Sequence, residues 1–209
     1  MLEAVRKKIQ VSPLFAILPT VLAATGEWRI LAAIIFAVAL HEFGHIFMLK
    51  MLGGSISFVR FGIVGAEIGY GSGSTAAGGI AETDNLSYLG EAAAALAGPA
   101  ASLISAIIAA LAGQLLEVPG AYFFSGLNLA LAAFNLLPVY PLDGGRALYC
   151  VLAHIFGLNA AAAVCRALKI VVSAVVAVGG ALLLWKTKNP TLIIAAGYLL
   201  GAGRGRKNT

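Results

Sequence analysis

The sequence His41-Glu42-Phe43-Gly44-His45 brings two imidazoles and a carboxylate together within about one turn of a helix. Because residues four apart share a helix face, His41 and His45 can reach one tetrahedral zinc ion, with Glu42 placed to handle a water there. The alternative is two histidines that are hydrogen-bonded inside a helix bundle. The motif directly follows an apolar run, Ile30 to Leu40, so it predicts zinc chemistry inside a membrane helix.

A catalytic zinc ion takes three protein ligands, so one more acid or histidine must come from elsewhere in the chain. Asp84 lies in a polar stretch, where a turn or a helix cap is a sufficient explanation. Asp143 follows a segment in which Pro138 and Pro141 end the preceding helix, and two glycines that permit sharp turns come after it. We therefore expect Asp143 to be the third ligand. A capping acid paired with Arg146 is the alternative.

The composition indicates an integral membrane protein. Hydrophobic residues make up 60% of the chain, charged residues 11%, and the mean hydropathy is +0.94, which exceeds what a water-soluble domain of this length carries. We expect an all-α polytopic fold with about six transmembrane segments, of which the first and last are short. The expected segments are Leu14–Ala24, Ile30–Met51, Tyr88–Leu116, Ala121–Leu137, Ala160–Trp185 and Thr191–Gly203.

The basic residues divide unequally between the two sides of these segments. Of the 14 Lys and Arg residues, all but Arg29, Lys186 and Lys188 fall on one side. Because Lys and Arg collect on the cytoplasmic side, both termini and the opening of the active site are predicted to be cytoplasmic in a multi-pass protein of the cell membrane. This topology accounts for the net charge of +5 without a nucleic-acid partner. It also brings Asp143 to the same end of the membrane as the two histidines.

Residues 55–74 have the pattern of short strands, because β-branched and aromatic residues stand there between glycines. We expect a small membrane-associated β-hairpin or sheet between the second and third spans. Its open edge, with Phe58 and Phe61, is predicted to bind an extended substrate by strand addition. A flexible loop is the alternative.

Two further groups of residues have simpler interpretations. Small residues recur every four positions at Ala94, Gly98 and Ser102, which permits close helix packing and which we interpret as scaffold. Cys150 and Cys165 are expected to be buried thiols. Metal binding by Cys150 with His154 is the alternative.

The motif HEFGH, followed later in the chain by NLLPVYPLDGG, resembles the site-2 protease family of intramembrane zinc metalloproteases. The resemblance includes the small residues Leu96 to Ala100, covers Ala33 to Leu148, and is closest to the branch of the stage IV sporulation protein FB. It implies zinc bound by His41, His45 and Asp143. It also implies that Glu42 is the catalytic acid and base and that Asn135 lies near the substrate.

The resemblance also implies a zinc-dependent endopeptidase that cuts a membrane-tethered regulatory protein, such as a pro-sigma factor, in regulated intramembrane proteolysis. We expect residues 1–209 to form a single intramembrane metalloprotease domain with no CBS or PDZ domain, so that regulation would fall to partner proteins in the membrane. One alternative is a catalytically silent membrane adaptor that keeps the site for folding. Another is a transporter that uses the cluster for metal ions or protons. The intact Glu42 beside the two histidines favours catalysis over both.

Overall fold

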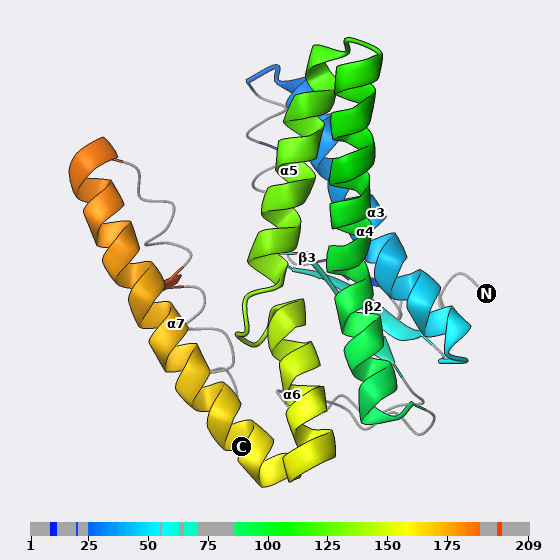
Figure 1. Ribbon diagram of the computed structural model, residues 1–209, viewed down its shortest axis with the longest axis vertical. Helices are drawn as coiled ribbons and strands as arrows, with labels where there is room; N and C mark the ends of the chain where they lie inside the picture. The colour runs from blue at the N-terminus through cyan, green and yellow to red at the C-terminus, as the bar shows by residue number, and fades with distance from the viewer. Residues whose placement is uncertain are drawn as a thin grey trace. The chain divides into compact units, whose positions relative to one another are not determined.

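The computed structural model describes residues 9–11, 20, 25–54, 56–62, 65–70, 86–188 and 196–197. Within them, five helices make up most of the structure (Figure 1). They are α3 (Trp28–Met51), α4 (Tyr88–Leu115), α5 (Pro119–Asn135), α6 (Asp143–Phe156) and α7 (Leu158–Thr187).

Three of these helices, α3, α4 and α7, are long and apolar enough to cross a membrane. At 1.5 Å per residue, the 24 residues of α3 extend about 36 Å, which exceeds the roughly 30 Å of a hydrocarbon core. With 17 and 14 residues, α5 and α6 are shorter than a full span. These features support a membrane protein.

The expectation of about six spans is wrong, because the described residues contain three candidate spans. The apolar run Ala121–Leu137 does contain a helix, but α5 ends at Asn135, before Pro138, and is too short to count as a span. Leu14–Ala24 and Thr191–Gly203 lie outside the described residues, apart from Thr20 and residues 196–197. An apolar run indicates that a segment is buried, either in lipid or in protein. Helix length can distinguish a membrane span from a buried helix only when both ends of the helix are known.

Three short strands form a small sheet in the order β1-β2-β3. They are β1 (Ile9–Val11), β2 (Ile56–Gly62) and β3 (Gly65–Tyr70). β2 pairs antiparallel with β3 and parallel with β1. This corrects the expectation of a hairpin or sheet built from residues 55–74 alone, because the third strand comes from a segment that precedes every expected span. Strand propensity identifies a strand but does not identify its partner.

The position of β2 in this sheet bears on the predicted strand addition. Phe58 and Phe61 lie on the central strand, where Phe61 is opposite Val11 on one side and Ala66 on the other. The backbone of β2 is therefore already paired on both sides at Phe61. Among the described strands, β1 and β3 are the edge strands, so an edge suited to strand addition is offered by these two strands rather than by β2.

The chain divides into two compact units, and α4 contributes residues to both. The first unit contains α3, the sheet, and the part of α4 and α5 within Ala97–Ala133. The second contains the beginning of α4, over Tyr88–Leu96, together with the last two residues of α5, Phe134 and Asn135, and with α6 and α7. Gly157 joins α6 to α7 with a φ of 82°, a conformation that favours glycine.

Candidate metal centre

Helix α3 holds His41 and His45 on one buried face, with 4% and 5% of their surfaces exposed. Their Nε2 atoms lie 3.2 Å apart. Two nitrogens that bind one tetrahedral zinc ion, each at about 2.0–2.1 Å, are separated by about 3.3 Å. The spacing of the two Nε2 atoms therefore fits two ligands of a shared zinc ion.

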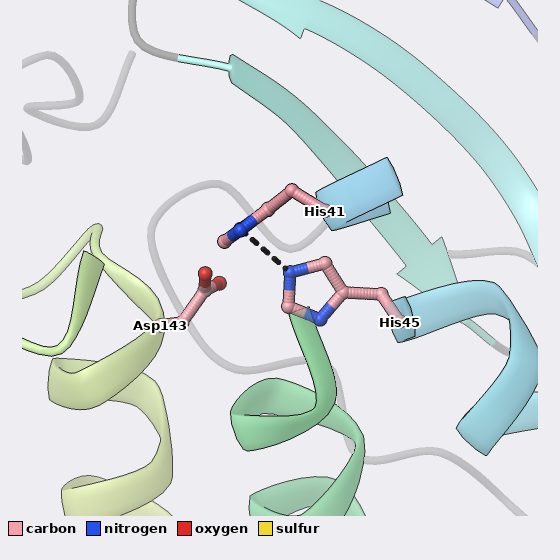
Figure 2. Close-up of side chains that lie close together, drawn as sticks. All are labelled: His41, His45 and Asp143. Carbon is pink, nitrogen blue, oxygen red and sulfur yellow. Dashed lines mark hydrogen bonds between the residues drawn. The ribbon is translucent and has the colours of Figure 1, made fainter. Parts of the chain in front are cut away.

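Asp143 belongs to the same cluster. The possible ligand atoms of His41, His45 and Asp143 all lie within 4.8 Å of one another. Figure 2 shows the three side chains directed toward one another. Two imidazole nitrogens and one carboxylate oxygen form a donor set that suits zinc, and three protein ligands leave a fourth position for water or substrate.

The sequence around Asp143 folds differently from its predicted form. Asp143 is the first residue of α6 and follows Leu142, which is extended with φ −70° and ψ 158°. A Cβ atom at Gly144 would overlap the backbone of Leu136, and one at Gly145 would overlap the backbone at Val139. The two glycines therefore allow the first turn of α6 to pack against the preceding loop. Neither glycine has a positive φ, so it is close packing rather than a sharp turn that requires them.

Glycines also bring α4 close to α3. A Cβ atom at Gly44 would overlap the carbonyl oxygen of Ala97 and lie 2.7 Å from the Cβ of Ala101. A Cβ atom at Gly98 would overlap the ring of His45. Since side chains at these positions would push the two helices apart, Gly44 and Gly98 allow the backbone of α4 to contact the histidines.

Ser102 lies one helical turn after Gly98 and contacts the other histidine. Its Oγ is 2.9 Å from Nδ1 of His41, and no part of Ser102 is exposed. The interpretation of Ala94, Gly98 and Ser102 as scaffold was thus incomplete, because two of these residues contact the histidines. The four-residue period was the available signal, but it does not reveal which helix the small face meets.

The structure describes the remaining candidates, Asn135, Phe58 and Phe61, to different extents, and Asn128 is a further buried polar residue of α5. Asn135 is the last residue of α5 and is buried, with 8% of its surface exposed. Asn128 is fully buried, and its Nδ2 donates a hydrogen bond of 2.9 Å to the carbonyl oxygen of Phe124 within the same helix. Phe58 and Phe61 are described only as backbone positions of β2, so their proposed role in substrate binding remains a prediction.

Cys150 is a buried free thiol and Cys165 a half-buried one. The Sγ of Cys150 lies 3.7 Å from a carboxylate oxygen of Glu91, to which it donates. Burial, with a smaller contribution from Glu91, raises the pKa of Cys150 to about 12. His154 is exposed while Cys150 is buried against Glu91, and the group of described residues that could hold a metal ion consists of His41, His45 and Asp143.

The chain is similar to known proteins that are named as zinc metalloproteases. Residues 118–179 match the family described as Peptidase family M50. Zinc metalloprotease MJ0392 of Methanocaldococcus jannaschii is 32% identical over 136 residues, which cover 62% of this chain and 36% of that protein. A Mycobacterium tuberculosis protein named Rip3 is 32% identical over 174 residues, which cover 78% of this chain and 40% of Rip3. The chain thus spans well under half the length of these curated relatives.

A solved structure extends the similarity to nearly the whole chain. The site-2 protease from Methanocaldococcus jannaschii matches with a TM-score of 0.67 and 22% identity, covering 96% of this chain and 91% of that one. This likeness shows that the two chains share a fold. The peptidase match and the relatives named as zinc metalloproteases support the expectation of a zinc-dependent protease.

Proposed function

We propose that this protein is an intramembrane zinc metalloprotease of the site-2 protease family. The observation that carries the proposal is the cluster of His41, His45 and Asp143, whose ligand atoms lie within 4.8 Å of one another. Both histidines belong to α3, a helix that is long and apolar enough to span a membrane. Ionisable groups are costly at such a depth and are usually functional. The match to a peptidase family indicates that the function of these groups is proteolysis.

His41, His45 and Asp143 would hold the zinc ion, which supplies a Lewis acid for a peptide carbonyl and for an attacking water. Glu42 directly follows His41 on α3, and its Oε2 atom is buried. We propose that a carboxylate oxygen of Glu42 accepts a proton from the attacking water. Glu42 would then donate this proton to the nitrogen of the leaving amine. The buried histidines exclude bulk water from their side of the site.

The proposed substrate is a membrane-tethered regulatory protein. The resemblance to stage IV sporulation protein FB suggests a pro-sigma factor of sporulation. A peptide bond inside a helix is hydrogen-bonded and shielded, so the substrate must be extended before it is cut. We propose that an open sheet edge holds it by strand addition, with contributions from Phe58, Phe61 and Asn135. Since β2 is the central strand, the outer edges of β1 and β3 are the better candidates for the backbone contacts.

The proposed setting takes up the distribution of charge over the six expected segments, of which three correspond to candidate spans in the described residues. Both termini and the opening of the site would face the cytoplasm. Residues 1–209 would act as one protease domain, regulated by other proteins of the membrane.

The first test is the zinc content of the detergent-purified protein, measured for the wild type, Asp143→Ala and Glu42→Gln. We expect stoichiometric zinc in the wild type and in Glu42→Gln, and a marked loss in Asp143→Ala. Glu42→Gln should then fail to cleave a membrane-tethered reporter that the wild type cuts. Undiminished cleavage by Glu42→Gln would refute the acid–base role. A folded wild type that takes up no zinc would favour the silent adaptor, and zinc transport in proteoliposomes would favour the transporter.

A further inference from the structure

We propose that Ser102 is a positioning residue that sets the tautomer of His41 and thereby presents Nε2 of His41 to the metal. The inference rests on the proposed function, since it concerns the same zinc site. Its basis is the contact of 2.9 Å between Ser102 Oγ and His41 Nδ1, formed between two side chains that are 0% and 4% exposed.

A neutral imidazole carries its proton on one nitrogen and a lone pair on the other. If the proton is on Nδ1 of His41, that N–H donates to Ser102 Oγ and the lone pair of Nε2 stays available for a metal ion. The same assignment is compatible with the second contact of the ring, between Nε2 of His41 and Nε2 of His45 at 3.2 Å. With the proton of His41 on Nδ1, Nε2 of His41 is the acceptor in this contact and Nε2–H of His45 is the donor. In the opposite tautomer Nδ1 would carry no proton, and the N–H on Nε2 would occupy the direction of the metal.

The partner of Nδ1 has to come from the protein at this position. Ser102 and His41 are both buried on the contact face of α4 with α3, which Gly44 and Gly98 make unusually close. Removing the hydroxyl would take away the buried acceptor that the structure places 2.9 Å from Nδ1. An outer hydrogen-bond partner of a metal-binding histidine commonly contributes 10- to 100-fold, by order of magnitude, to metal affinity.

Helix α4 therefore holds the two histidines by different means, one turn apart. Ser102 fixes the ring of His41 by a hydrogen bond. Gly98 fixes the ring of His45 by backbone packing, because the ring lies where a Cβ atom would be. The stretch Gly98 to Ser102 is thus the outer support of the proposed metal site.

The test compares Ser102→Ala with Ser105→Ala. Ser105 lies on the same helix, and its Oγ donates to the carbonyl oxygen of Ala101 at 2.8 Å, so the control loses a hydroxyl that serves α4 itself. Zinc affinity is measured in detergent by competition with a chelator of known affinity. We expect Ser102→Ala to bind zinc about 10- to 100-fold more weakly than the wild type, and Ser105→Ala to stay within about threefold of it.

A second readout reports the tautomer directly. The chain has three histidines, so protein labelled with ¹⁵N only in histidine gives a spectrum simple enough to assign with His45→Ala and His154→Ala. We expect His41 in the metal-free wild type and in Ser105→Ala to carry its proton on Nδ1, and Ser102→Ala to show a mixture of tautomers. A general loss of packing would not produce this selective change.

The outcomes separate this inference from the proposed function. If the wild type binds zinc and Ser102→Ala binds it as tightly as Ser105→Ala, the positioning role is overturned while the protease proposal stands. A wild-type His41 protonated on Nε2 would overturn it equally. If the wild type binds no zinc, the proposed function fails, and the inference about ligand positioning fails with it.

Discussion

Replacing Gly98 by alanine separates the stability of α4 from the geometry of the metal site. Inside a helix, alanine is normally more stable than glycine by about 0.5–1 kcal/mol. At Gly98 the added Cβ would overlap the His45 ring and lie 2.7 Å from its Cδ2 atom. Because two carbon atoms in contact need about 3.5–4.0 Å, the ring must move by about 1 Å or α4 must retreat from α3.

Such a displacement is large for a metal ligand. Ligand distances in metal sites are held to within about 0.2 Å, so a shift of about 1 Å removes His45 from coordination. We expect Gly98→Ala to weaken zinc binding by at least about 100-fold, the upper end of what an outer hydrogen-bond partner contributes. Cleavage of a reporter should fall by a similar factor, since misplacements of this size cost about 100-fold in rate.

The matched control is Gly126→Ala on α5. Gly126 is also a helical glycine, and a Cβ atom there would meet nothing within 4 Å. This variant should keep its zinc affinity and gain about 0.5–1 kcal/mol in the free energy of unfolding. Chelator competition and thermal unfolding in the presence of chelator measure the two quantities. If Gly98→Ala bound zinc within about threefold of Gly126→Ala, the close approach of α4 to His45 would not be what positions the ring.

Three further results are expected. Asp143→Asn should lose most of its zinc in elemental analysis, because a neutral amide is a poorer ligand than a carboxylate; full retention would contradict the role of Asp143. Chelation should lower the melting temperature of the wild type but not of Asp143→Asn, since a ligand at 100 times its Kd contributes about 2.7 kcal/mol; equal shifts would point to an effect elsewhere. Cys150 should resist iodoacetamide at pH 8 in the folded protein, because burial raises its pKa to about 12 and keeps the thiol protonated. Rapid labelling, read by mass spectrometry, would show that Cys150 is accessible.

The parts of the site that sequence could predict are those that depend on local geometry. The spacing of His41 and His45 fixes their common face on any helix, and the structure places both on the buried side of α3. Asp143 could be proposed because few other acids are available for a third ligand, and its ligand atoms lie with those of the histidines. The contact of Ser102 with His41 joins residues 61 positions apart, and no local pattern encodes which helices pack together.

The fold was harder to predict for a related reason. Hydropathy predicted the regions of α3, α4, α5 and α7 but not α6, and it did not predict the number of spans, since α5 is apolar yet shorter than a span. The strand pattern in 55–74 did not reveal that Ile9–Val11 pairs with β2, because a parallel partner can lie anywhere in the chain. In each case the missing information was a long-range contact.

The contacts of α4 explain why Gly44 stands inside the HEFGH motif. Zinc chemistry requires the two histidines and the glutamate, and nothing in that chemistry requires a glycine at the fourth position. The requirement comes from packing, because a Cβ atom at Gly44 would overlap the carbonyl oxygen of Ala97 and hold α4 away from α3. Inside a membrane, water is not freely available as the outer partner of a ligand, so the neighbouring helix must supply it. The small residues of both helices are therefore needed for Ser102 to reach His41, and the motif encodes the support of the proposed ligands together with the ligands themselves.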